Sequence, residues 1–394
     1  MAVGADSAPR PLAALTGATG FLGRHVIRAL HKAGFRVRIL VRQDPVHPLT
    51  AAVPLEVVPG DLSSDAALER LVRGADAVIH AAGLIKAAGR KDFFAINEGG
   101  SARLGRAMAK AAPGARLVVV SSLAAREPQL SPYAASKRAG EEAAVRCSGT
   151  EDWVVLRPPA LYGPGDRETL ALFKAADSPV VPVAGGPGAR LALLHVEDCA
   201  AAVAALARPG GPRGQTYELA DGKPGGYGWA DLLDTAAAAL GHKAVRVRVA
   251  APLLRGMGLA GSGWAWLLRR PVMMTSGKVR EILHPDWSVD PSGMPPRACG
   301  SPPASCWKDL RNPFPGTDTR AGYRPKAVTA RDGVAELPNA RLFCACNKLS
   351  RRFLLASVGV ALTLQPDDDL CMDAEASVSL IPFQKTLPEF ARVR

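Results

Sequence analysis

The chain has few of the residues that mark several common classes of protein. Aromatic residues make up only 5% of its 394 residues, and the lysines and arginines behind its net charge of +13 are scattered. A nucleic-acid surface would need clustered basic residues and aromatic rings for stacking, so we expect no nucleic-acid partner. No apolar run reaches the roughly 18 residues needed to cross a bilayer. The positive charge then indicates a basic, solvated surface and an anionic cofactor.

Cysteines are also few and irregularly placed. Seven of them, an odd number, favour free thiols over a disulfide framework. Cys344-Ala345-Cys346 lacks the second pair that a zinc site needs, so we expect no metal. No charged and then apolar leader precedes the first predicted strand, and we expect a cytoplasmic protein.

Short apolar strands alternate with helical periodicity from Pro11 to about Asp198. The pattern predicts strands at 12–15, 36–41, 55–58, 77–80, 116–120 and 153–156, and helices at 20–33, at 92–111 and after Pro132. Such βαβ units predict an α/β fold with a doubly wound parallel sheet of the Rossmann type, whose ligand crevice lies at the carboxyl ends of the strands.

Composition divides the chain into three parts. We expect a nucleotide-binding domain over 1–160, to which 190–205 return, and a smaller, mostly helical substrate lobe over 161–290. From 291 to 394 proline, serine, arginine and cysteine become frequent and helical periodicity is lost. This last part is predicted to be an irregular, disordered or poorly folded tail.

The most informative segment is the glycine-rich turn after the first strand, which reads Thr-Gly-Ala-Thr-Gly-Phe-Leu-Gly. Gly17 permits a tight turn, Gly20 lets the backbone approach a pyrophosphate, and Gly23 allows close packing of helix on sheet. The turn therefore predicts a dinucleotide site, and its predicted cofactor-binding residues are Gly17, Thr19, Gly20, Phe21, Leu22 and Gly23.

The ends of the next strands carry further candidates for cofactor binding. Arg42 follows the second strand, where an NAD-selective site would normally have an acidic residue, so its guanidinium favours the 2′-phosphate of NADP. Nearby Asp44 leaves NAD possible. Asp61, followed by Leu62, could accept from the adenine amino group or cap a helix together with Ser63 or Ser64. Small residues after the fourth strand, Ala81, Ala82 and Gly83, would let the cofactor pass, whereas His80 is expected to be packed.

Tyr133 and Lys137 carry the predicted chemistry. Their spacing of four residues places them on one helical face, where the ammonium, together with a positive nicotinamide ring, would lower the pKa of the phenol. Two serines end the fifth strand, and Ser122 is preferred over Ser121 as the substrate-binding hydroxyl because neighbours in a strand point to opposite sides.

With these motifs the chain resembles the extended short-chain dehydrogenase/reductase family, of the NAD-dependent epimerase/dehydratase kind, over about residues 11 to 290. The family includes nucleotide-sugar epimerases, dihydroflavonol reductases and 3β-hydroxysteroid dehydrogenases. The resemblance extends to Asn97, which looks like the family's asparagine supporting the active-site helix, to the segment Arg157–Gly165, and to His195-Val196-Glu197-Asp198. It implies that Pro158 contacts the cofactor.

The resemblance implies hydride transfer between a nicotinamide and a ketone or secondary alcohol. Tyr133 would exchange the proton, Ser122 would orient the oxygen, and Lys137 would hold the cofactor. Dehydration is not expected, because Glu127 is the only acid soon after the serines and comes late. A nucleotide-sugar epimerase with tightly bound NAD and a non-catalytic NADP(H)-binding subunit remain as alternatives.

Substrate and partners depend on the segment from Pro252 to Arg270, which is rich in leucine, glycine and tryptophan. It suits a hydrophobic ketone, such as a lipid-like or steroid-like compound. The favoured alternative is a buried helix that packs on the core, and a further one is contact with a membrane surface. The family resemblance implies a homodimer through the helices that flank the active site.

Overall fold

The computed structural model describes residues 9–42, 47–166, 168, 178, 180–186, 188–239, 245–270, 272, 274–290, 292 and 294–295. The predicted tail, apart from Ser292, Met294 and Pro295, and Asp44 lie outside the described residues. All described residues belong to one unit, Met1–Ala321.

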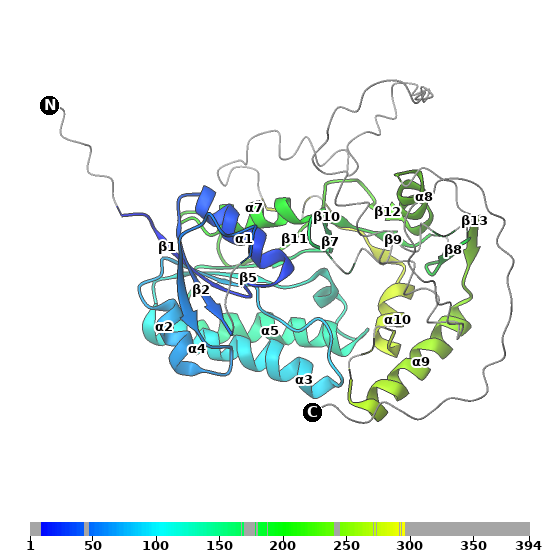
Figure 1. The fold of residues 1–394 in the computed structure, drawn as a ribbon, viewed down its shortest axis with the longest axis horizontal. Helices are drawn as coiled ribbons and strands as arrows, with labels where there is room; N and C mark the ends of the chain where they lie inside the picture. Colours follow the sequence, from blue (N-terminus) through cyan, green and yellow to red (C-terminus); the bar gives the residue numbers. More distant parts are fainter. Residues whose placement is uncertain are drawn as a thin grey trace, which may run out of the picture. The chain divides into compact units, whose positions relative to one another are not determined.

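A seven-stranded parallel sheet forms the centre of the described structure (Figure 1). Its order is β11-β6-β5-β4-β1-β2-β3, with crossovers on both sides of β1. The strands are β1 Leu12–Thr16, β2 Arg36–Val41, β3 Leu55–Pro59, β4 Ala77–His80, β5 Arg116–Val120, β6 Trp153–Arg157 and β11 Gln215–Glu218. The first six match the predicted strands within one residue, which confirms the doubly wound fold. The seventh, β11, was not predicted, because Gln-Thr-Tyr-Glu has no apolar run.

Helices cover both faces of this sheet (Figure 1). One face packs α1 Phe21–Lys32 and α7 Val196–Leu206, and the other packs α2 Asp65–Val72, α4 Ser101–Ala111 and α5 Pro132–Ser148. Buried α7 residues such as Cys199 and Val203 belong to the same apolar cluster as β1 and α1. Residues 196–206 therefore pack on the same face of the sheet as α1.

The predicted helix over 92–111 is an interrupted one. It consists of α3 Arg90–Phe94, a π-helical turn η1 Ala95–Gly100, and α4. Asn97 lies within the π turn, a feature that often occurs at functional sites. A Cβ at Gly140 of α5 would collide with the Asn97 carbonyl, so this glycine permits α5 to lie directly against the turn.

The region after β6 combines three helices with short strands. The helices are α8 Trp229–Ala239, α9 Ala251–Leu268 and α10 Ser276–Leu283. The short strands of this region form small sheets: β10 Leu193–His195 pairs with β7 Ala160–Tyr162, and β13 Val245–Arg248 pairs with β8 Val180–Val183. A third small sheet contains β12 Tyr227–Gly228, β9 Arg190–Leu191 and β14 Asp286–Trp287. Among the described helices, none is both long and apolar enough to cross a membrane.

Candidate active site

The glycine turn between β1 and α1 has the shape that a dinucleotide needs. Gly17 has a φ of 77°, and a Cβ there would lie 2.6 Å from the backbone of Ala81 and Ala82. A Cβ at Gly23 would collide with the Gly17 carbonyl. Gly20 caps α1 and has no side chain that could accept from the first amides of the helix, so an anion is favoured at this helix N-terminus. The residues present therefore fit the pyrophosphate of a dinucleotide.

The other predicted cofactor residues lie at the carboxyl ends of the strands. Arg42 is exposed at the end of β2. Hydrogen bonds from Ser63 lower the pKa of Asp61, and the positive charge of Arg42 lowers it further. Asp61 closes a short turn by accepting from the Ser63 amide at 2.8 Å, while Ser64 caps α2. Pro158 is buried, and its carbonyl accepts from the Leu123 amide, next to Ser122.

The helix α5 carries Tyr133 in its first turn and Lys137 one turn later. Ser131 caps this helix by accepting from the Ala134 amide at 2.9 Å, and Pro132 occupies its first position. The Lys137 ammonium donates to the Val120 carbonyl at 3.1 Å, at the carboxyl end of β5. Ser122 lies two residues after Val120, and its side chain forms a hydrogen bond with Tyr133. The three predicted groups, Ser122, Tyr133 and Lys137, therefore come together.

Burial perturbs both titrating groups. It raises the pKa of Tyr133 to about 12, opposed by the hydrogen bond with Ser122 and assisted by the negative charge of Glu281. It lowers the pKa of Lys137 to about 8, opposed by Glu141. The expected depression of the phenol pKa by the ammonium is therefore wrong for the protein alone, because desolvation dominates. A phenol with this pKa stays protonated at neutral pH and can act as a proton donor.

Asn97 supports the site from the π turn and has no free side-chain group. Its amide donates to the Leu84 carbonyl at 3.0 Å and to Ser136 Oγ at 2.9 Å, and its oxygen accepts from the Leu84 amide at 2.6 Å. Ser136 lies on α5 between Tyr133 and Lys137. Asn97 thus joins the Ala81–Gly83 loop to the catalytic helix and acts as a positioning residue.

His80 belongs to a buried chain of hydrogen bonds, as expected for a packed histidine. Its Nδ1 lies 2.8 Å from Thr16 Oγ1 and its Nε2 lies 2.8 Å from Ser101 Oγ, whose hydroxyl donates to the Asn97 carbonyl. Burial and Lys137 lower the His80 pKa to about 3, so the ring is neutral. The Ser101 hydroxyl already donates its proton to the Asn97 carbonyl, so it can only accept from His80. Nε2–H of His80 must therefore donate to Ser101, and Nδ1 must accept from Thr16. The chain runs from the glycine turn to Asn97 without an unsatisfied partner.

The two serines after β5 differ in environment. Ser121 is buried, and its hydroxyl has no hydrogen-bond partner among the described residues. Ser122 is partly exposed, begins the 3-10 turn η2 Leu123–Arg126, and accepts from the Ala124 amide at 3.2 Å. This arrangement follows the strand alternation on which the preference for Ser122 rested.

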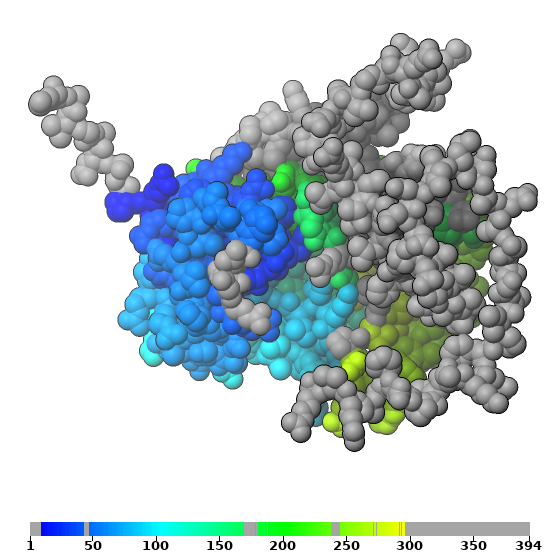
Figure 2. All heavy atoms as spheres, viewed as in Figure 1, coloured from blue at the N-terminus to red at the C-terminus, as the bar shows by residue number. Residues whose placement is uncertain are grey.

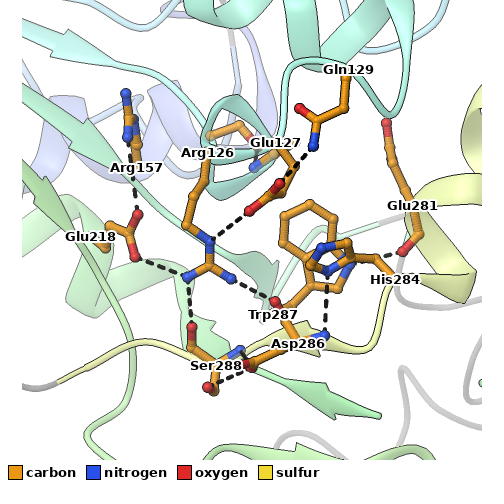
Figure 3. Close-up of polar contacts among 12 residues, drawn as sticks. Arg126, Glu127, Gln129, Arg157, Glu218, Glu281, His284, Asp286, Trp287 and Ser288 are labelled. Carbon is orange, nitrogen blue, oxygen red and sulfur yellow. Dashed lines mark hydrogen bonds and ion pairs between the residues drawn. The ribbon is translucent and has the colours of Figure 1, made fainter. Parts of the chain in front are cut away.

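Charged residues beyond Ser122 connect the catalytic elements to the later part of the chain (Figure 3). Arg126 donates to Glu218 at 3.1 Å and to the backbone carbonyls of Ser288 and Asp286 at 2.8 and 2.6 Å. Its guanidinium also lies 5.7 Å from the Trp287 ring centre. This role of Arg126 could not be predicted from the sequence, since a lone arginine after a strand has no recognisable spacing.

Two buried carboxylates hold α5 itself. Glu141 accepts from Arg157 through two bonds of 2.9 and 2.7 Å, which ties α5 to β6. Glu281 of α10 accepts from the Ser131 hydroxyl and, at 3.1 Å, from Lys278, so the later region reaches the cap of the catalytic helix. Arg157, quoted above for family resemblance, is therefore a structural residue.

Aromatic residues adjoin the site. The Phe93 ring of α3 lies 6.0 Å from that of Tyr133. Tyr162, after β6, stacks edge-on against His195 at 5.3 Å, and His195 caps α7 within the predicted His-Val-Glu-Asp segment. His25 of α1 packs edge-on against Phe21 and lies 3.2 Å from the Pro164 carbonyl, so the Arg157–Gly165 segment meets the glycine turn.

Comparison with known proteins identifies the family. Residues 13–220 match the model of the NAD dependent epimerase/dehydratase family. The chain is 49% identical over 287 residues to a ceramide reductase of Caulobacter vibrioides, covering 73% of this chain and 88% of that protein. It is 29% identical over 229 residues to a 4-hydroxy-2-methyl-3-oxo-4-farnesyl-3,4-dihydroquinoline-1-oxide ketoreductase of Stigmatella aurantiaca, covering 53% and 68%.

A solved structure, gox2253, shares the fold with a TM-score of 0.53 at 22% identity, covering 77% of this chain and 97% of that one. The glycine turn, the parallel sheet and the relatives all indicate the same family. The chain belongs to the NAD dependent epimerase/dehydratase family and is an NAD(P)-dependent oxidoreductase of the extended short-chain dehydrogenase/reductase type.

Proposed function

We propose that the chain reduces a hydrophobic, lipid-like ketone with NADPH, using Ser122, Tyr133 and Lys137. The observation that carries the proposal is the arrangement of three groups: Ser122 interacts with the Tyr133 phenol, and Lys137, one turn further along α5, donates to the Val120 carbonyl at the carboxyl end of β5. A bound NADPH would supply a hydride to the substrate carbon. Tyr133 would give its proton to the substrate oxygen, and Ser122 would orient that oxygen.

Lys137 and Asn97 have supporting roles in this proposal. The Lys137 ammonium, held by the Val120 carbonyl, would bind the ribose hydroxyls of the cofactor. Asn97 holds the Ala81–Gly83 loop against α5. This contact would fix the position of the loop, which lies on the cofactor side of the site, relative to the proton donor Tyr133. Around the cofactor, the proposed contacts are those of the glycine turn together with Arg42, Asp61, Leu62, Ala81, Ala82, Gly83 and Pro158.

The hydrophobic substrate is supported by the surroundings of the site and by the relatives. Phe93 lies against Tyr133, and Ile85, which follows the Asn97-bound Leu84, is exposed. Two related reductases have names that refer to a ceramide and to a farnesyl compound. The NADP preference is supported by exposed Arg42 at the end of β2.

Partners and location belong to the same proposal. A homodimer would use the outer face of α3, η1, α4 and α5. A shallow hollow there is lined by Phe94, by small residues and by charged ones, namely Lys91, Glu98, Arg103, Arg106 and Arg146. A cytoplasmic location is supported by the free Cys147 and Cys199. Peripheral contact with a membrane would bring the enzyme to a lipid-like ketone.

One experiment tests the proposal through cofactor binding and turnover. NADPH should bind more tightly than NADH, and Arg42→Asp should remove this preference, whereas Arg73→Asp, an exposed arginine on the same domain, should not. With bound NADPH and a long-chain ketone, Tyr133→Phe should lower kcat by about 10²–10⁴-fold with cofactor affinity retained. Ser122→Ala should lower kcat more than Ser121→Ala.

Other results would favour the alternatives. NAD that stays bound through purification, with turnover of a nucleotide sugar and not of ketones, would support an epimerase. Tight NADPH binding without turnover of any ketone would support a non-catalytic subunit.

A further inference from the structure

The helix α9 has an unusual distribution of large and small residues. Its inner side, which packs on α10, consists of Leu254 with small residues such as Gly258, Gly261 and Ala265. A Cβ at Gly258 would lie 2.8 Å from Val279 of α10, so the small residues permit close contact. The large apolar residues of the helix must therefore lie elsewhere.

Most of those large residues are exposed to solvent. The exposed fractions are 60% for Leu253, 47% for Met257, 68% for Leu259, 58% for Trp264, 80% for Trp266, 64% for Leu267 and 45% for Leu268. Leu253, Met257, Trp264 and Leu268 recur at intervals of four, seven and four residues, which places them in one stripe along the helix. The prediction of a buried packing helix is thus wrong for most of the apolar residues in this segment.

The segment of the sequence that contains α9 has charged residues of one sign, and one of them, Arg246, pairs with Asp234 at the edge of the segment at 3.5 Å. Asp234 and Glu281 bound a stretch without any acidic residue, and this stretch contains Arg246, Arg248, Arg255, Arg269 and Arg270 as well as lysines. The five arginines named are all exposed. In Figure 2 the yellow-green part of the chain, which includes α9, reaches the molecular surface. A second protein would need matching acids and a complementary shape, whereas an anionic lipid surface needs only negative charge and an apolar layer.

We infer that α9 is a docking surface for an anionic lipid bilayer, with its apolar stripe in the interface and its arginines on the headgroups. Tryptophans favour the boundary between headgroups and acyl chains, where Trp264 of the stripe would lie. This inference extends the proposed membrane contact to a defined surface. A lipid-like ketone could then reach the site from the bilayer without crossing water.

The test uses the full chain, without cofactor or substrate, and vesicles of phosphatidylcholine with or without phosphatidylglycerol. The wild type should float with the anionic vesicles and bind less at high salt. Arg269→Gln with Arg270→Gln should lower partitioning about 30-fold, because each basic residue contributes about 1 kcal/mol near an anionic surface and 1.4 kcal/mol is tenfold. The exposed pair Lys32→Gln and Arg73→Gln should change partitioning little.

A second measurement locates the contact on α9. Bromolipids should quench tryptophan fluorescence in the wild type and much less in the Trp264→Phe, Trp266→Phe double variant, whose fold is checked by circular dichroism. No vesicle binding, or equal loss in both charge pairs, would overturn the inference. So would a dimer that Leu253→Gln with Leu267→Gln converts to monomer, since the face would then join two copies. Turnover of a water-soluble ketone stays a separate readout of the proposed reduction.

Discussion

The sheet region and the region around α8, α9 and α10 bury their apolar residues in different ways. Two large clusters fill both faces of the sheet, from β1 and α1 on one side to β5 and α4 on the other. The later region has only small clusters among its described residues, such as Val181, Val183, Leu233, Ala236 and Ala237. The sheet region therefore holds itself together, whereas the later region depends on polar contacts with the catalytic elements.

Those polar contacts converge on the segments that carry the chemistry. Arg126, four residues after Ser122, binds the backbone of β14, and Glu281 binds the cap of the Tyr133 helix. Leu123, next to Ser122, also packs with Ala192, Ala220 and Val289. The later region is therefore attached at the catalytic residues themselves, so movement of this region should change the geometry of the site.

The largest expected effect comes from removing a leucine from each region. Leu117→Ala in β5 should lower the free energy of unfolding by about 3 to 4 kcal/mol, because the residue is fully buried within the sheet cluster. Leu254→Ala in α9 removes the same group from a helix that packs chiefly on α10. It should loosen α9 and α10 and leave the sheet stable. Denaturant unfolding followed by hydrogen exchange measures both. Equal loss of protection in the sheet for Leu254→Ala would show a single cooperative unit and break the comparison.

A smaller effect is expected at the polar attachment. Arg126→Met should destabilise β14 locally by about 2 kcal/mol, since hydrogen bonds to a charged group are lost from a partly buried site. Amides of residues 286–289 should exchange faster, and KM for the ketone should rise more than kcat falls. The matched control is Arg138→Met, an exposed arginine of α5 paired with Glu142, whose loss should cost about 0.3 to 0.5 kcal/mol. Unchanged exchange in Arg126→Met would show that apolar contacts alone hold the region.

The two regions also differ in how far the sequence could predict them. Strands of the sheet are buried on both faces, so continuous apolar runs such as Leu-Val-Val-Val marked them to within a residue. The glycine turn and the Tyr133–Lys137 spacing could be recognised because their geometry is local. The partnership of Ser122 with Tyr133 followed from their expected places at one edge of the sheet.

What the sequence could not show depended on contacts between distant residues. Arg126 and Glu218 are 92 positions apart, and Ser131 and Glu281 are 150 positions apart. The sign of the Tyr133 pKa change depended on burial, which no spacing reveals. The choice between a packed and an exposed α9 could not be made from the sequence, because an apolar helix with small residues has no sequence signal for which side packs.

The smallest expected effect is the change of kcat/KM with pH. This measurement tests whether the titrating groups of the reaction belong to the sheet region alone. Burial lowers the Lys137 pKa to about 8, so its ammonium is lost as pH rises through this value, whereas Tyr133, with a pKa of about 12, stays protonated. If the ammonium is needed, kcat/KM for ketone reduction should be flat below pH 8 and fall about tenfold per pH unit above it. Lys137→Arg keeps its charge throughout, so its profile should be lower but free of this break. A break that persists in Lys137→Arg would assign the titration to another group, and with it part of the chemistry to residues outside the β5 and α5 ends.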